Sequence, residues 1–132
     1  MFNKVETPEQ AFEITGITPD LEKFKACYPA DRVQSKFDEF VIELVCEATN
    51  KINGNWKADW NDDDQYKYST AHWVEADDTK PAGFGLSGAG CGGWDTDATV
   101  GERLLVGSAE QAIYIGDQFR HLFESARLIV RE

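Results

Sequence analysis

The sequence contains few cysteines and histidines, and their small number limits which disulfide and metal sites the protein can form. Its 132 residues include two histidines and three cysteines, Cys27, Cys46 and Cys91, with no C-x-x-C pair. An odd count without such a pair argues against both a disulfide framework and a structural zinc site. A reducing compartment, the cytoplasm, is therefore expected.

Long apolar runs are also missing. No 18 apolar residues follow one another, and the opening MFNKVETPEQ lacks the apolar core of a signal peptide. We therefore expect no contact with a membrane. The length predicts a single domain over residues 1–132, and a hydrophobic fraction of 42% is enough for an ordinary core.

Basic side chains are scarce relative to acidic ones. Lys and Arg number 13 and Asp and Glu 24, which gives a net charge of −11. A field of this sign repels phosphate backbones, so direct nucleic-acid binding is not expected. The partner expected instead is a protein, one with a basic surface. An acidic chain can also mimic DNA in the basic groove of a nucleic-acid-binding protein.

Helix signals open the chain. Thr7-Pro8-Glu9-Gln10 predicts a capped start with proline at the first helical position, and Gly16 predicts the end. Thr18-Pro19-Asp20 repeats the start signal before a second short helix, which Tyr28-Pro29 ends.

The strongest helix signal covers residues 31–52. Apolar side chains recur there at steps of three and four, which predicts one buried stripe. Asp31 is the expected N-cap, and Asn53-Gly54 the expected end. The stripe consists of Val33, Phe37, Phe40, Val41, Leu44, Val45, Ala48 and Ile52.

Three strands are predicted in the second half of the chain. Alternation predicts the first over residues 66–75, a shorter one follows over 82–87, and a Val- and Leu-rich one over 99–106. The glycine-rich residues 88–97 between the last two are predicted to be a loop.

A capping box at Ser108 predicts a last helix through Phe123, in which Gly116 allows close approach to another element. The fold class expected is α+β: a meander of about three strands packed against the long and last helices, preceded by short N-terminal helices.

The glycine-rich segment contains the spacing of a dinucleotide fingerprint. Gly88, Gly90 and Gly93 spell G-x-G-x-x-G. That motif requires a helix to begin inside it, so that the helix N-terminus can hold the pyrophosphate. Here Trp94, the polar residues 95–97 and then a predicted strand follow. We therefore interpret the segment as a hairpin loop and expect no cofactor.

The acidic run resembles the opening of a calcium loop. Asp59, Asn61 and Asp63 place oxygen ligands at alternate positions, but the sixth and twelfth positions hold Asp64 and Thr70 instead of Gly and Glu. A solvated acidic turn is the favoured interpretation, with weak divalent-cation binding as the alternative.

No catalytic constellation is recognisable. His121 faces away from the apolar stripe of its helix, and His72 lies on a strand without an evident nucleophile or metal partner. Cys91 has no neighbouring cation to activate it, and Cys46 is expected to pack in the core. We therefore predict that the protein is not an enzyme.

Aromatic side chains gather in the acidic half of the chain, and exposed Trp and Tyr favour protein interfaces. For Trp56 and Trp60, packing inside an aromatic-rich sheet is the favoured alternative. Trp94 in particular is expected to be exposed. The predicted partner-binding residues are Trp56, Asp59, Trp60, Asp62, Asp63, Asp64 and Trp94.

Five phrases occur in an order that resembles a known family. They are Trp56-Lys-Ala-Asp-Trp60, Tyr66-Lys-Tyr68, Gly83-Phe-Gly-Leu-Ser87, Thr99-Val-Gly-Glu-Arg-Leu104 and Glu110-Gln-Ala-Ile-Tyr-Ile-Gly-Asp-Gln-Phe119. Together, over residues 47–123, they resemble a family of small uncharacterised proteins encoded by phages, prophages and conjugative elements of gut anaerobic bacteria. The resemblance implies a mobile-element origin and a shared fold, and it assigns no activity or catalytic residues. The sequence departs from the family at Ala58, where relatives carry Pro, and at residues 88–93, where they carry aromatic or acidic residues.

The function expected from these patterns is that of a mobile-element accessory protein acting by protein–protein contact. Its acidic, aromatic surface would bind a basic partner, for example a nucleic-acid-processing protein. One alternative is a small-ligand or divalent-cation binding domain, and another is a structural component of a phage virion. The sequence does not predict the oligomeric state.

Overall fold

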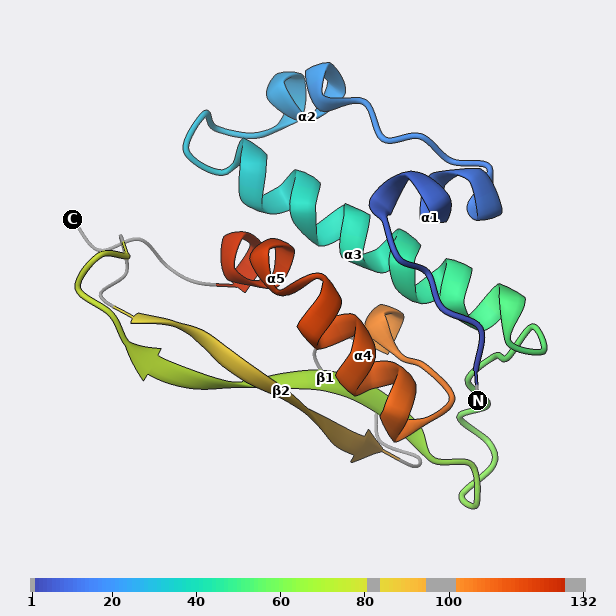
Figure 1. Cartoon of the computed structure of the whole chain (residues 1–132). Helices are drawn as coiled ribbons and strands as arrows, with labels where there is room; N and C mark the ends of the chain where they lie inside the picture. The colour runs from blue at the N-terminus through green and yellow to red at the C-terminus, as the bar shows by residue number, and fades with distance from the viewer. Residues whose placement is uncertain (1, 81–83, 95–101, 128–132) are drawn as a thin grey trace.

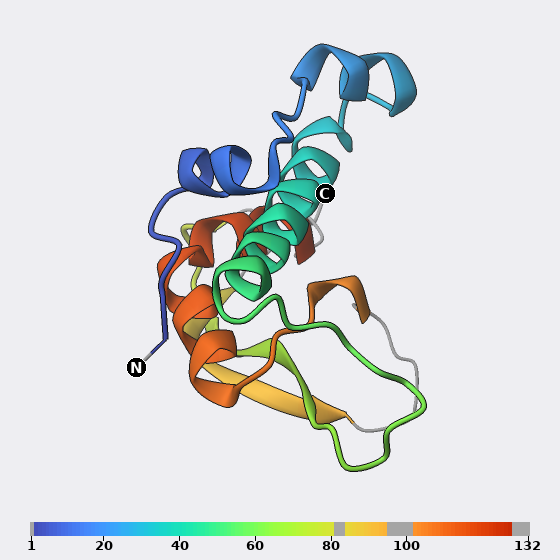
Figure 2. The ribbon, with the colours of Figure 1, turned by 90° about the vertical axis from the view of Figure 1, so that its right-hand side faces the viewer.

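The computed structural model describes residues 2–80, 84–94 and 102–127. These residues form an α+β protein with five α-helices, one 3-10 helix and a two-stranded antiparallel sheet. In chain order the elements are α1 (Pro8–Thr15), α2 (Leu21–Cys27), α3 (Val33–Ile52), β1 (Lys67–Ala76), β2 (Phe84–Trp94), η1 (Glu102–Leu104), α4 (Ala109–Gln118) and α5 (Arg120–Arg127). Helices α4 and α5 lie between α3 and the two strands, while α1 and α2 lie across α3 (Figures 1 and 2).

The local helix signals are largely confirmed. The side chains of Thr7, Asp20 and Ser108 each accept a hydrogen bond from an N–H in the first turn of α1, α2 and α4. Gly16 ends α1 with φ of 73°, a left-handed conformation that glycine adopts without steric cost.

Two helix boundaries differ from the prediction. Asp31 does not cap α3, which begins at Val33 after Arg32 and has no side-chain cap. The single last helix that was predicted is two helices, because Phe119 leaves helical geometry at φ −112° and ψ 28°. Phe119 at the break and Phe123 in α5, each 1% exposed, reach the same core.

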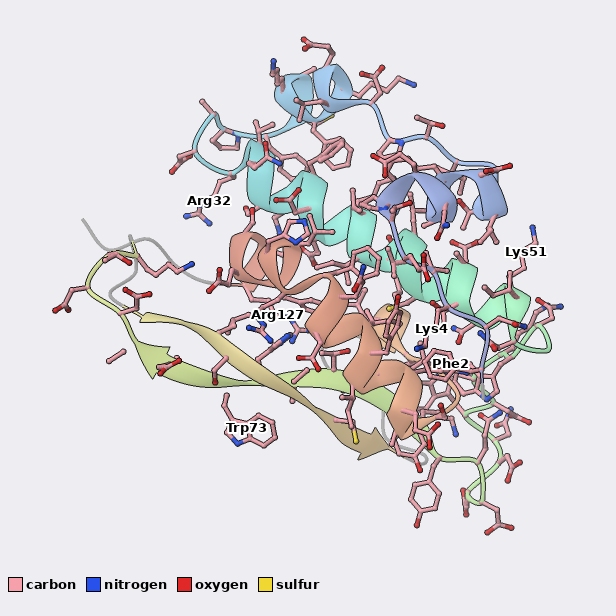
Figure 3. All side chains as sticks on the ribbon, viewed as in Figure 1. Phe2, Lys4, Arg32, Lys51, Trp73 and Arg127 are labelled. Carbon is pink, nitrogen blue, oxygen red and sulfur yellow. The ribbon has the colours of Figure 1, made fainter. Side chains whose placement is uncertain are left out.

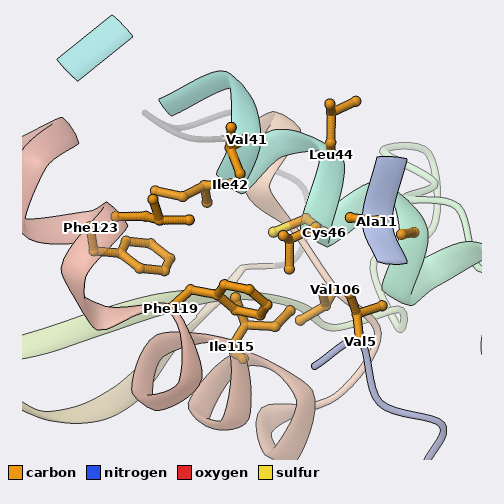
Figure 4. Close-up of a cluster of buried hydrophobic side chains, with 14 residues drawn as sticks. Val5, Ala11, Val41, Ile42, Leu44, Cys46, Val106, Ile115, Phe119 and Phe123 are labelled. Atoms are coloured by element: carbon orange, nitrogen blue, oxygen red, sulfur yellow. The ribbon is translucent and has the colours of Figure 1, made fainter. Parts of the chain in front are cut away.

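The core lies where the apolar stripe of α3 meets α4 and α5 (Figure 4). Ala11 of α1 and Val5 of the N-terminal segment close it from the other side. Its buried members are Val5, Ala11, Val41, Ile42, Leu44, Val45, Cys46, Ala48, Val106, Ala112, Ile115, Phe119, Leu122 and Phe123. No helix in the described ranges is long and apolar enough to cross a membrane.

Helix α4 rests on the sheet at Gly116. A Cβ at this position would lie 2.5 Å from Cγ2 of Thr70 and 2.7 Å from Cβ of Ala89. The close approach also permits hydrogen bonds to the helix backbone: Thr70 Oγ1 donates to the Ala112 carbonyl at 2.7 Å, and His72 Nε2 lies 2.9 Å from the Gly116 carbonyl. The close helix packing predicted for Gly116 is therefore confirmed.

The loop predicted over residues 88–97 is wrong for residues 88–94, which belong to β2, while residues 95–97 lie outside the described ranges. Gly90 pairs with Ala71, and Gly93 with Tyr68, in one antiparallel register with β1. Glycine is usually depleted in strands, since it has no side chain to pack. Here the Trp73 ring supplies the missing contact: a Cβ at Gly90 would lie 3.1 Å from Cη2 of Trp73, and one at Gly88 3.7 Å from Cε3.

A third strand and a meander are not found in the described part of the chain. Of the predicted strand over residues 99–106, residues 99–101 lie outside the described ranges. Glu102–Leu104 form η1, and Val106 makes a single antiparallel bridge to Tyr68. The apolar Leu105 and Val106 are buried as the pattern suggested, but they enter the core from a short connection.

We predict that Gly116→Ala destabilises the fold. Alanine favours a helix over glycine by about 1 kcal/mol. The clash with Thr70 and Ala89 outweighs this gain, so the free energy of unfolding is expected to fall by about 1–3 kcal/mol. Chemical denaturation measures the change. Gly88→Ala is the control, since a methyl there meets only ordinary contacts. A stabilised Gly116→Ala variant would contradict the described packing.

Candidate functional site

The acidic residues predicted to contact a partner lie together on the connection between α3 and β1. Asp59, Asp62, Asp63 and Asp64 are all exposed. We call residues 59–64 the acidic loop. It lies beside the start of β1, at one end of the sheet (Figures 1 and 2).

The acidic loop is held in shape by its own side chains. Asp59 Oδ1 accepts a hydrogen bond from the Asn61 N–H at 3.0 Å, and Asp62 Oδ1 accepts one from the Asp64 N–H at 2.9 Å. Gln65 closes the base, because its Oε1 accepts from the Asp59 N–H and its Nε2 donates to the Lys57 carbonyl. Two such Asx turns fix the backbone of the loop.

A buried lysine organises the same loop. Lys67, 0% exposed, donates from Nζ to the carbonyls of Gln65, at 2.9 Å, and Asp62, at 3.3 Å. The amine also lies 5.1 Å from the ring centre of Trp60, within the range of a cation–π interaction. The loop is therefore wrapped around a cation, with its carboxylates turned outward.

The predicted tryptophans do not all lie on the surface. Trp60 is half-buried by Lys67, and Trp56 is half-buried against Gly107, whose Cβ, if it had one, would lie 2.9 Å from Cδ1 of Trp56. Both rings thus pack within the fold. The backbone of Trp94 ends β2, and its side chain lies outside what the structure describes.

An exposed aromatic that the sequence analysis did not select is Trp73. It is 64% exposed and lies on the side of the sheet turned away from the helices (Figure 3). A register shift in the pairing falls between His72 and Val74, at the position of Trp73 itself. In the sequence, Trp73 belongs to the same alternating set of the strand as Lys67, Ser69, Ala71 and Glu75. This mainly polar set is typical of the solvent-facing side of a strand, which indicates an exposed Trp73.

Carboxylates of α4 and α5 cover part of the outer edge of β2. The N–H of Ala89 donates to Asp117 Oδ1 at 3.2 Å, and the N–H of Leu86 donates to Glu124 Oε1 at 2.8 Å. Glu124 also pairs with Lys80 at 3.2 Å. These bonds, chiefly the one from Leu86, lower the pKa of Glu124. They also satisfy edge groups that would otherwise be open to another strand.

The remaining titratable candidates have structural partners. Cys46 is 2% exposed in the core, as predicted, and this burial raises the pKa of its thiol to about 12. His72 packs on Phe123 with ring centres 4.9 Å apart. The guanidinium of Arg127 lies over the same Phe123 ring and donates to the Thr70 carbonyl, and burial lowers its pKa.

Across residues 2–80, 84–94 and 102–127, no three His, Cys, Asp or Glu side chains gather as a metal ion would need. A shallow, open groove of about 450 Å³ lies between α2 and the start of α3. It is lined by Leu21, Lys25, Ala30, Val33 and Gln34, and so by none of the predicted site residues.

We predict that Lys67→Met loosens the acidic loop. Methionine keeps the buried stem but removes the donor to the carbonyls of Asp62 and Gln65, so the loop loses about 1 kcal/mol of local stability. Amide hydrogen exchange over residues 59–66 should accelerate several-fold. The exposed Lys57→Met is the matched control. Unchanged exchange in Lys67→Met would show that the loop does not depend on this lysine.

A second prediction concerns acid stability. Because the folded-state pKa of Glu124 is lowered, its contribution is complete above the ordinary value of 4.5 and is lost as pH falls through the folded pKa. Glu124→Gln should therefore flatten the decline in unfolding free energy below pH 4.5, as followed by denaturation at several pH values. An acid decline identical to that of the unaltered protein would contradict the role given to this carboxylate.

Comparisons of the chain with known proteins identify no relative. The chain matches no protein-family model, no curated protein and no solved structure. The function proposed for the protein therefore rests on the acidic loop and on the exposed Trp73 alone.

Proposed function

We propose that the protein is a non-enzymatic binding module whose acidic loop contacts a basic surface on a protein partner. The observation that carries the proposal is the loop built around Lys67, which turns Asp59, Asp62, Asp63 and Asp64 to solvent on a fixed backbone. A preorganised loop spends less conformational entropy on binding than a mobile one does.

The charge of the whole chain supports the same proposal. A net charge of −11 on 132 residues attracts a basic partner over roughly 10 Å at 0.1 M ionic strength and accelerates encounter. The acidic loop adds a local concentration of negative charge to this field. Electrostatic contacts of this kind set association rate and specificity, and they weaken as salt is added.

The sequence resemblance supplies the proposed context. An accessory protein of a phage or another mobile element would act in the host cytoplasm, and nucleic-acid-processing proteins there present basic grooves. An acidic module of this size fits such a groove better than it fits nucleic acid itself, because phosphate and carboxylate repel each other.

The test compares the charge of the acidic loop with the net charge of the whole chain. Asp62→Asn, Asp63→Asn and Asp64→Asn are combined, since asparagine keeps the side-chain oxygen of the Asx turn while the charge is removed. The control combines Glu9→Gln, Glu13→Gln and Glu47→Gln, exposed acids on α1 and α3, and has the same net charge.

Partners are captured from host lysate on the tagged full chain at low and high salt, identified by mass spectrometry and remeasured with the purified partner. We expect a partner that is released by high salt and bound at least tenfold more weakly by the asparagine variant than by the control. Equal weakening of both variants, or binding indifferent to salt, would contradict a role for the acidic loop.

A further inference from the structure

We propose that the outer face of the sheet is a platform for an arginine-containing basic segment of the partner, with the guanidinium stacked on Trp73. We define this face by Ala71, Trp73, Glu75, Gly88 and Gly90 and call it the Trp73 face. The proposal rests on the proposed function, and it names the chemistry that the partner must present.

The Trp73 ring is held in place before any partner arrives. Its six-membered ring lies against the backbone of Gly88 and Gly90, where a Cβ would come within 3.7 and 3.1 Å of ring carbons. Ser87 Oγ donates to the Trp73 carbonyl at 3.2 Å and fixes the same position of the strand. With 64% of the residue still exposed, ring surface that does not rest on the glycines is left to solvent.

The charge around the ring favours a cation. Glu75 follows Trp73 by two residues and therefore lies on the same face of β1, and Asp77 and Asp78 follow directly after the strand. Hydrogen bonds from the hydroxyl and N–H of Thr79 lower the pKa of Asp77. Lys80, the cation beside this turn, is paired with Glu124.

Arginine fits this surface better than lysine. Its guanidinium is planar and weakly hydrated, stacks on an aromatic face, and still presents donors at its edge to a carboxylate such as Glu75. A lysine ammonium is a strongly hydrated point charge and gains less from the flat ring. A second copy of the chain is disfavoured as the occupant, because each copy carries a net charge of −11.

The experiment titrates the full chain with three labelled peptides of equal length and spacing, carrying arginine, lysine or citrulline. Citrulline keeps the planar shape of arginine without its charge. We expect the arginine peptide to bind about two- to fivefold more tightly than the lysine peptide, and the citrulline peptide to bind weakest. Trp73→Ala should abolish the preference for arginine and leave the lysine peptide nearly unchanged, and Trp73→Phe should keep part of the preference.

Val74→Ala is the matched control, since Val74 is 61% exposed on the same strand but alternation turns it to the other face. Equal binding of arginine and lysine peptides, or an arginine preference that survives in Trp73→Ala, would overturn the platform while leaving the acidic module intact. Absence of salt-sensitive binding to either basic peptide would overturn both. Tightest binding of the citrulline peptide would instead indicate a neutral partner.

Discussion

The contact between Gly116 of α4 and the β1–β2 pair is the constraint on which the rest of the structure depends. A two-stranded sheet is at best marginally stable by itself and needs a packed face. Here the face is made by Thr70, His72 and Ala89, and the side chains of Thr70 and His72 bond to carbonyls one helical turn apart on α4. With α4 fixed on the strands, Phe119 and Phe123 are positioned to meet the apolar stripe of α3.

The glycines of β2 connect this packing to the proposed binding surface. Ala89 is small enough to lie under Gly116, and on the opposite face Gly88 and Gly90 leave room for the Trp73 ring to pack against them. One strand with small side chains thus allows a helix to approach on one side and a tryptophan to lie on the other. The glycines that make this segment look like a loop in the sequence have no side chains to cover the Trp73 ring, which stays 64% exposed.

The helices could be predicted from the sequence because their signals are local. Caps at Thr7 and Ser108, the stop at Gly16 and the stripe of α3 act within a few residues. The glycine strand could not be predicted in the same way, since it is stabilised by Trp73 and Gly116, which lie far away in the sequence. The break at Phe119 has no signal in the sequence, because the apolar spacing of the predicted helix continues through Phe119, Leu122 and Phe123.

The candidate site was predictable in its charge but not in its aromatic residues. Exposure of Asp59, Asp62, Asp63 and Asp64 follows from the cost of burying carboxylates. Whether a tryptophan is exposed depends on what it packs on, and Trp60 lies on Lys67 while Trp73 lies on glycines. Lys67 is the least predictable element, because a fully buried amine held by backbone carbonyls leaves no pattern in the sequence.

Amide chemical-shift mapping tests the account most directly. An arginine-rich peptide is titrated into the isotope-labelled chain, and the perturbed backbone amides are assigned. The account predicts changes concentrated in residues 59–64 and 71–78 and in Gly88–Gly90, with α1 and α2 unaffected. Changes centred on the groove between α2 and α3, or spread evenly over the acidic surface, would contradict a binding site on this face of the sheet.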